Sequence, residues 1–328
     1  MTTQEIFEGF ERLKVLVIGD VMIDRYLVGK VERISPEAPV PIVNLENEDN
    51  RLGGAANVVL NLKALGATPF LCSIIGTDEA ALTFQQLMKN EALSNIGILT
   101  EESRKTTVKT RVLAKNQQLL RFDSEITTPI NETITERFIS HVQNLIDNQN
   151  IDVVLFQDYN KGVLVPKVIT TIIDYCNDKK IPTAVDPKRE NFFAYKNITL
   201  FKPNLKEVSD ALDFSLSSHD NESLKKAAKA INSRLTNTFT LITLSEKGMY
   251  LDNHKERVII PTQPRHIADV CGAGDTVISV ASLGLALGIS MKLTCQLANL
   301  AGGIVCESVG VVPVNREKLM EEFADLKE

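Results

Sequence analysis

The chain has 328 residues, a formal net charge of −6, a hydrophobic fraction of 44% and a charged fraction of 24%. This composition is typical of a globular protein that can bury a core and form a deep cleft. The acidic balance argues against nucleic acid as the main partner, although a few placed cations could still bind a small anion. The five cysteines form no C-x-x-C pair, and we find no signal peptide and no membrane-spanning run. We therefore expect a cytoplasmic protein without a membrane partner.

Short apolar runs and amphipathic helical patterns alternate along most of the chain. This alternation predicts an α/β fold with a doubly wound, mostly parallel central sheet flanked by helices. The expected strands are 14–19, 69–75, 152–157, 182–185, 199–202 and 239–244, and the expected helices are 55–65, 79–90, 132–148, 166–179, 222–235, 274–287 and 291–308.

Two segments interrupt this alternation, at 26–46 and 106–122. Each has β-type residues without a helix between neighbouring strands, which predicts a hairpin. We expect the two hairpins to form one small sheet, a lid inserted into a single domain spanning 1–328. The outer face of this lid would expose Ile42, Val43 or Leu45, which favours a homodimer.

The most informative motif is Gly272-Ala273-Gly274-Asp275 at the start of an expected helix. The glycines allow a tight turn that presents N–H groups, and the positive end of the helix dipole lies at the same point. Such a turn is an anion hole for a phosphoryl group, and Asp275 could accept the proton of an attacking hydroxyl. A glycine-rich helix cap without a ligand would have the same sequence.

A second motif is Lys202-Pro-Asn204-Leu-Lys-Glu207, which follows an expected strand and opens a helix. Asn204 and Glu207 have the spacing of a capping box, which would explain both residues structurally. The alternative is that they lie near the nucleotide phosphates, with Glu207 bound to Mg²⁺ through water.

Polar residues also follow the first strand and precede the first expected helix. Asp20 and Asp24 lie at the carboxyl end of that strand, where open α/β sheets bind ligands. Gly53 and Gly54 would bring the backbone close to a ligand, and Asn57 could bind hydroxyl groups. A solvated turn and a glycine turn without ligand are the structural alternatives.

Three further motifs follow other expected strands. Asp158 with Lys161, and Asp186 with Lys188, could recognise a polar or anionic substrate, or could form surface ion pairs. Thr243, Ser245 and Gly248 could line a nucleotide pocket or form a turn. The sequence contains no P-loop, no dinucleotide fingerprint after the first strand, no nucleophile elbow and no histidine pair at metal spacing.

Taken in order, Gly-Asp, Gly-Gly-Ala-Ala-Asn, Asn-x-x-Glu and Gly-Ala-Gly-Asp resemble the ribokinase-like carbohydrate kinase family. The resemblance covers about residues 15–312. It implies an ATP-dependent kinase with a β-lid that often mediates dimerisation. The segments 19–26, 33–41, 116–121, 158–162 and 186–188 further resemble D-glycero-D-manno-heptose 7-phosphate kinases, which phosphorylate O1 on the route to ADP-heptose, a lipopolysaccharide precursor.

The resemblance implies roles for individual residues. Asp275 would be the base, and 272–274 the anion hole. Relatives often carry a fused nucleotidyltransferase domain, and we expect the stand-alone kinase here. Cys271 stands where threonine is usual. The other implied roles are ATP–Mg²⁺ binding by Lys202, Asn204, Glu207, Thr243, Ser245, Gly248 and Asn299; substrate binding by Asp20, Asp24, Gly53, Gly54, Asn57, Arg111, Gln117, Asp158, Lys161 and Lys188; and a potassium-type cation site at Asp269.

Two other functions remain open at this point. One is a kinase of the same family that acts on ribose, a fructose phosphate or a nucleoside. The other is a non-catalytic sugar or nucleotide sensor on the same fold, because fold alone does not prove activity.

Overall fold

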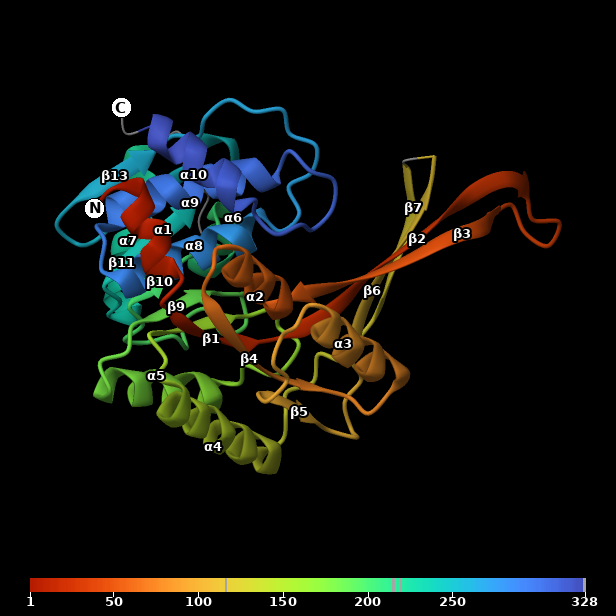
Figure 1. The fold of residues 1–328 in the computed structure, drawn as a ribbon, viewed down its shortest axis with the longest axis horizontal. Helices are drawn as coiled ribbons and strands as arrows, with labels where there is room; N and C mark the ends of the chain where they lie inside the picture. The colour runs from red at the N-terminus through yellow and green to blue at the C-terminus, as the bar shows by residue number, and fades with distance from the viewer. Residues whose placement is uncertain (116, 214–215, 219, 327–328) are drawn as a thin grey trace.

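The computed structural model describes residues 1–115, 117–213, 216–218 and 220–326, and these residues form two β-sheets (Figure 1). The larger sheet has nine strands, and its strand pairings are parallel except those of β12 with β11 and with β13 at one edge. In spatial order its strands are β13 (Arg257–Ile260), β12 (Met249–Asp252), β11 (Phe239–Thr243), β10 (Leu200–Phe201), β9 (Thr183–Asp186), β8 (Val153–Gln157), β1 (Lys14–Gly19), β4 (Thr68–Ile75) and β5 (Ile98–Thr100).

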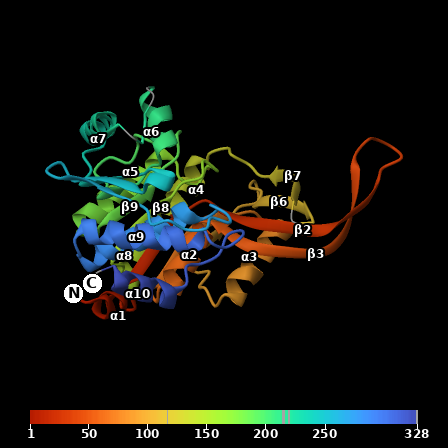
Figure 2. The same cartoon turned by 90° about the horizontal axis from the view of Figure 1, so that it is seen from above.

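Helices cover both faces of this sheet (Figure 2). The central strands are buried on both faces and therefore carry continuous apolar runs, as in β8, in which every residue is buried. One face packs against α1 (Thr3–Phe10), α2 (Ala55–Ala64), α3 (Glu79–Asn90), α8 (Ala273–Leu287), α9 (Met291–Val305) and α10 (Arg316–Asp325). The other packs against α4 (Glu132–Gln149), α5 (Pro166–Asp178), α6 (Leu205–Leu212) and α7 (Asn221–Leu235). The predicted doubly wound, mostly parallel architecture is confirmed.

The two predicted hairpins pair into one four-stranded sheet that projects from the large sheet (Figure 1), and we call it the lid. Its order is β3-β2-β6-β7, in which β2 and β6 are parallel and the outer pairs are antiparallel. The strands are β2 (Val21–Ile34), β3 (Pro41–Gly54), β6 (Thr107–Ala114) and β7 (Gln117–Ser124).

The first lid hairpin is longer than the sequence predicted. It begins at Val21 and ends at Gly54, rather than at 26 and 46. The base of the hairpin, at 21–24 and 52–54, is buried on both faces, so the apolar–polar alternation that marks a half-buried strand is lost there. The outer part of the lid leaves Leu45 exposed as predicted, with Leu120 and Phe122 also exposed. Ile42 and Val43 are half-buried.

Several elements were not predicted, namely α1, α10, β5 and the β12–β13 hairpin. The signal for α1 is a capping box between Thr2 and Glu5, which is readable in the sequence. The helix expected at 291–308 ends earlier, at Val305. Within the described parts of the chain, every helix is too short or too polar to cross a bilayer.

Candidate active site

Asp275 lies in the first turn of α8, and its side chain is buried. Gly272 is the N-cap residue of this helix and has φ of 82°, a left-handed conformation that favours glycine. The first N–H groups of a helix have no partner within the helix, and the positive end of the dipole adds to their attraction for anions. The N–H of Ala273 donates to the carbonyl of Val270 at 3.3 Å, and the role of this turn as an anion hole stays a prediction.

Three side-chain donors hold the carboxylate of Asp275. Asn57 Nδ2 lies 2.7 Å from Oδ2, while Tyr159 Oη and Gln157 Nε2 lie 2.8 Å and 3.1 Å from Oδ1. These donors come from α2, from the end of β8 and from the loop after β8. The side-chain oxygens of Asn57 and Gln157 are buried without a hydrogen-bond partner among the described residues. The site thus contains two unused acceptors next to its candidate base.

Burial raises the pKa of Asp275 to about 6, with a further upward contribution from Asp186. The hydrogen bonds from Asn57 and Tyr159 and the charge of Lys202 act in the opposite direction. A carboxylate with a pKa near 6 is ionised at neutral pH yet more basic than an ordinary aspartate, as general-base catalysis requires.

A buried ion pair lies beneath the turn that precedes Asp275. Lys202 Nζ and Asp186 Oδ2 are 3.0 Å apart, and both side chains are almost fully buried. A Cβ atom on Gly274 would lie 3.8 Å from Lys202 Nζ, so this ammonium group is adjacent to the candidate anion hole. The predicted role of Lys202 in binding the nucleotide phosphates stays a prediction.

Asn204 and Glu207 form the predicted capping box of α6. Asn204 Oδ1 accepts from the N–H of Glu207 at 2.8 Å, and Glu207 Oε2 accepts from the N–H of Asn204 at 2.8 Å. Glu207 Oε1 also accepts a hydrogen bond from Lys188. Although burial opposes it, the carboxylates of Asp186 and Glu207 raise the pKa of Lys188. Lys188 Nζ also lies 5.7 Å from the centre of the Tyr159 ring, so it links the α6 cap to the base.

The role predicted for Glu207, holding Mg²⁺ through water, stays a prediction. Among the described residues, no three His, Cys, Asp or Glu side chains converge into a metal site. The two oxygens of the Glu207 carboxylate already accept hydrogen bonds from Lys188 and from the N–H of Asn204. Such a carboxylate can still orient the waters that Mg²⁺ retains.

Asp20 is buried, and its carboxylate accepts three backbone hydrogen bonds from the loop after β8. The donors are the N–H groups of Tyr159, Lys161 and Val163, at 2.9, 3.1 and 3.1 Å. Burial raises the pKa of Asp20, and these bonds act in the opposite direction. The contacts describe a residue that positions this loop, while its predicted contact with a sugar hydroxyl stays a prediction.

Asp24 lies at the base of the lid and pairs with Arg111 on β6. The Arg111 Nη1 to Asp24 Oδ1 distance is 2.6 Å. A Cβ atom on Gly53 would lie 2.2 Å from Asp24 Oδ2, so only glycine leaves room for this carboxylate. Gly54 is the N-cap of α2 with φ of 61°, and Asn57, in the first turn of this helix, donates to Asp275. The structure therefore brings these predicted residues together.

The two acid–base pairs proposed within single motifs do not form. The Asp158 carboxylate accepts from Tyr195 Oη at 2.7 Å, and Lys161 Nζ instead lies 2.7 Å from Glu125. Likewise, Asp186 pairs with Lys202 rather than with Lys188. Neighbouring positions on one loop point in different directions, so sequence proximity did not identify the partners.

The remaining predicted residues form their contacts with groups other than Asp275. Asp269 accepts from the N–H groups of Cys271 and Gly310 at 3.0 and 2.9 Å, and its cation-binding role stays a prediction. Gly248 has φ of 91° and forms the turn before β12. Thr243 forms an isolated β-bridge with Asn204, and Ser245 begins a short 3-10 turn. The side chain of Asn299 donates to the carbonyl of Pro261. Gln117 is exposed on the lid.

Sequence reasoning did not assign roles to Gln157, Tyr159 or the Asp186–Lys202 pairing. Their common signal is position, because each lies at or just after the carboxyl end of a parallel strand. Ligand-binding groups of open α/β sheets gather at that edge.

A doubly wound α/β fold with a lid and a buried carboxylate at a glycine-rich helix start is consistent with a carbohydrate kinase. Residues 12–318 match the pfkB family of carbohydrate kinases, and the chain belongs to this family. It is 39% identical over 308 residues to Bifunctional protein HldE of Helicobacter hepaticus and 41% identical over 313 residues to that of Syntrophotalea carbinolica. These matches cover 94% and 95% of the chain but only 63% of each relative.

Solved structures share the fold at low sequence identity. Phosphofructokinase-2 from Escherichia coli, in its tetrameric inhibited form, aligns with a TM-score of 0.78 at 18% identity, over 96% of this chain and 100% of that one. Arabidopsis thaliana ribokinase in complex with ribose and ATP aligns with a TM-score of 0.71 at 15% identity, over 94% and 99%. At this identity, both similarities are evidence for a shared fold only.

Proposed function

We propose that this sugar kinase transfers the γ-phosphoryl group of ATP to O1 of D-glycero-D-manno-heptose 7-phosphate, giving the 1,7-bisphosphate. The observation that carries the kinase chemistry is the buried Asp275 carboxylate, held by three donors at the start of α8. The heptose assignment is supported by about 40% identity to proteins named HldE along nearly the whole chain. The product would enter ADP-heptose biosynthesis in the cytoplasm.

In this mechanism Asp275 orients the O1 hydroxyl and accepts its proton as the oxygen attacks the γ-phosphorus. The bond from the γ-phosphorus to the bridging oxygen breaks, and ADP leaves. The N–H groups at the start of α8 bind the oxygens of the transferred group, and Lys202 adds positive charge next to them. Mg²⁺, when bound, would neutralise the phosphates, with Glu207 holding its waters.

The lid would close over the sugar and exclude water, which otherwise competes as the acceptor. The hydroxyl-binding residues would be Asp24, Asn57 and the backbone at 53–54, together with Asp20 and Gln117. A K⁺-type ion near Asp269 would act as an accessory cation. A phosphofructokinase-2 structure in complex with potassium exists within the same fold, at 20% identity.

The direct test is ADP release by the purified chain with Mg²⁺-ATP and D-glycero-D-manno-heptose 7-phosphate. Fructose 6-phosphate, fructose 1-phosphate and ribose are run beside it. We expect efficient turnover with the heptose phosphate alone. Preferred turnover of another sugar would replace the substrate assignment and keep the kinase, whereas no ADP release with any sugar would support the sensor alternative.

A further inference from the structure

Three neighbouring strands of the large sheet end in a row of polar side chains next to the first turn of α8. Gln157 and Asp186, the last residues of β8 and β9, are paired in register. Lys202 follows β10, the next strand, whose last residue pairs with Val185. Residues paired in register lie side by side on one face of a sheet. An amide, a carboxylate and an ammonium group therefore follow one another across the sheet edge.

Gln157 contacts two carboxylates through one nitrogen. Its Nε2 atom lies 3.1 Å from Asp275 Oδ1 and 3.5 Å from Asp186 Oδ2. The same oxygen of Asp186 lies 3.0 Å from Lys202 Nζ. An amide NH₂ group has two hydrogens, so one can be directed at each carboxylate. The Gln157 side chain thus forms a bridge between the candidate base and the buried ion pair.

The amide oxygen of Gln157 has no such contacts. The side chain is 1% exposed, and Oε1 is buried without a hydrogen-bond partner among the described residues. A buried acceptor without a partner costs free energy, and an apolar side chain would fill this position without that cost. The other four residues of β8 are all apolar. The contacts of the NH₂ group are therefore what a glutamine supplies here and an apolar residue would not.

Two carboxylates that share one donor group oppose each other's ionisation. The charge of Asp186 raises the pKa of Asp275, and the charge of Lys202 lowers it. A donor directed at both carboxylates offsets their repulsion. The charged and titratable groups that face Asp275 come from the carboxyl ends of β8, β9 and β10, and they are Tyr159, Asp186, Lys188 and Lys202. From α2, the neutral amide of Asn57 faces the same carboxylate.

We infer that Gln157 is a positioning residue of the phosphoryl transfer, which holds Asp275 in place as the base by bridging it to Asp186. This inference rests on the proposed function. Gln157 and Tyr159 both donate to Oδ1 of Asp275, whereas Oδ2 accepts one hydrogen bond, from Asn57. A carboxylate oxygen has two lone pairs, so Oδ2 keeps one for the hydroxyl of the sugar. Gln157 acts through Asp275 and has no contact with the substrate in this role.

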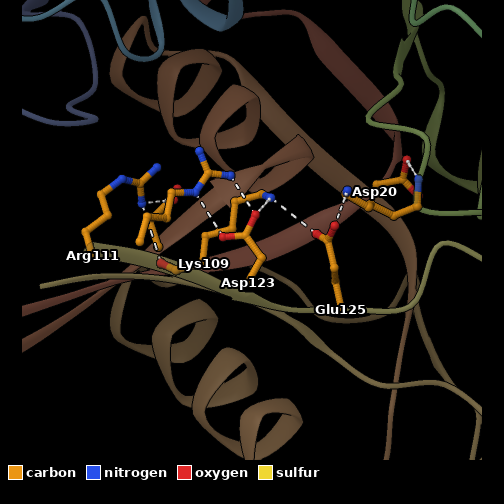
Figure 3. A network of polar contacts seen from close by, with 8 residues as sticks. Asp20, Lys109, Arg111, Asp123 and Glu125 are labelled. Atoms are coloured by element: carbon orange, nitrogen blue, oxygen red, sulfur yellow. Dashed lines mark hydrogen bonds and ion pairs between the residues drawn. The ribbon is translucent and has the colours of Figure 1, made fainter. Parts of the chain in front are cut away.

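The loop that carries Tyr159, the second donor to Oδ1, has its own support. Asp20 accepts from three N–H groups of this loop, and Glu125 forms an ion pair with it (Figure 3). A substitution at Gln157 leaves these contacts in place. Its effect on Asp275 can therefore be measured separately from that of Tyr159.

The test compares wild type with Gln157→Met in two measurements. One is the pH profile of kcat/KM in the ADP assay. The other is a carbon-13 NMR titration of the Asp275 carboxyl group without substrate, assigned by its absence in Asp275→Asn. Loss of one hydrogen bond to a carboxylate should raise the pKa of Asp275 by about one unit from its value of about 6. The base works when ionised, so kcat/KM should fall roughly fivefold near pH 6 and less than about twofold near pH 8.5.

Two further substitutions at glutamine positions complete this comparison. Gln157→Glu keeps the shape of the side chain but adds a third carboxyl group, so it should move the acid limb at least as far as Gln157→Met. Gln86 is exposed on α3, and its Nε2 atom donates to Asn90 at 2.8 Å or less, in a contact of 2.7 Å. Gln86→Met is the matched control and should leave both profiles as in wild type. An acid limb and a titration that stay in place in Gln157→Met would overturn the positioning role.

An Asp186→Asn background separates a bridge from a donor that serves Asp275 alone. Asparagine leaves an acceptor for Lys202 but removes the second negative charge. The pKa shift caused by Gln157→Met should then be smaller by at least about 0.4 unit, the lower end of couplings between contacting groups. Equal shifts in the two backgrounds would overturn the bridge.

The proposed function can fail without deciding this comparison. If wild type prefers another sugar, the heptose assignment fails and the pH profiles are measured with that sugar. If no sugar gives ADP, the proposed function fails, and the titration of Asp275 then supports or contradicts the bridge by itself, because it needs no turnover.

Discussion

Asn57 has an amide group that can adapt to a change at the base. Its nitrogen donates to Asp275, and its buried oxygen has no partner among the described residues. In an Asp275→Asn variant, rotation of the Asn57 amide would present this oxygen to the new NH₂ group. The substitution therefore removes the base and keeps one hydrogen bond between residues 57 and 275, while the Asn57 NH₂ group moves to the buried position that its oxygen leaves.

We expect Asp275→Asn to lower kcat by at least ~10²-fold, the usual size of a general-base effect. KM for ATP and the melting temperature should stay close to wild type, because the packing around α8 is preserved. Stopped or coupled ADP assays and thermal unfolding measure these quantities. Turnover close to that of wild type would remove Asp275 from the role of base.

Tyr159 offers a test of the pKa of the base. Burial raises the pKa of Asp275 to about 6, and the Tyr159 hydrogen bond holds it below a still higher value. The base works when ionised, so kcat/KM should rise with pH through about 6. Tyr159→Phe removes a donor to the carboxylate, which raises its pKa and shifts the acid limb to higher pH. The decrease in kcat/KM relative to wild type should be largest near pH 6 and smallest near pH 8.

The control for this profile is Tyr175→Phe, which removes a hydroxyl that contacts Asp147 on the surface at 2.8 Å. Its pH profile should match that of wild type. An acid limb that stays in place, or moves to lower pH, in Tyr159→Phe would contradict the assigned contact.

At the scale of elements, β9 and β10 share a charge pair inside the core. Asp186 is the last residue of β9, and Lys202 follows β10, the neighbouring parallel strand. Asp186→Ala would leave the buried Lys202 ammonium without this partner, which typically costs about 3–5 kcal/mol of unfolding free energy. Denaturant unfolding measures the change.

Two variants complete this comparison. Asp186→Ala combined with Lys202→Met should recover part of the lost stability, since no buried charge remains unpaired. Glu46→Ala, which breaks an exposed lid pair, should change stability by no more than about 0.5 kcal/mol. An Asp186→Ala protein as stable as Glu46→Ala would show that the buried pair is not required for stability.

The sequence predicted the core strands and helices closely because their burial gives a strong periodic signal. The strand expected at 14–19 and the helix expected at 79–90 have the predicted bounds. The base of the lid was missed because residues 21–24 lose the alternation that the outer strand shows. The short strand β10 has only two residues, too few for a pattern to define its ends.

The site was predicted less completely than the fold. Motifs identified Asp275, Asn57 and the Asn204–Glu207 cap, because these lie at glycine turns or helix starts with recognisable spacing. They did not identify Gln157 or Tyr159 as donors, or Glu125 as the partner of Lys161. Those contacts depend on strand register and side-chain direction, which no local pattern encodes.

At the scale of the whole molecule, the lid leaves apolar side chains exposed at its outer part. Leu45, Leu120 and Phe122 are 55%, 58% and 50% exposed. We expect the chain to be a homodimer at micromolar concentration, with this face buried between the two lids. Leu120→Glu combined with Phe122→Glu should give a monomer by light scattering. Leu82→Glu, which changes an exposed leucine on α3 outside the lid strands, should leave the mass unchanged. A monomeric wild type would contradict the proposal.

The hydrogen bonds around the base also join parts of the chain that are far apart in sequence. Asp275 is 218 residues from Asn57 and 118 from Gln157. Contacts of such long range form late, because closing large loops costs entropy before the contacts compensate. During refolding, helical signal should therefore return before ADP-forming activity. Enzyme activity would then report completion of the fold. A chain with native secondary structure but incomplete packing would form no ADP.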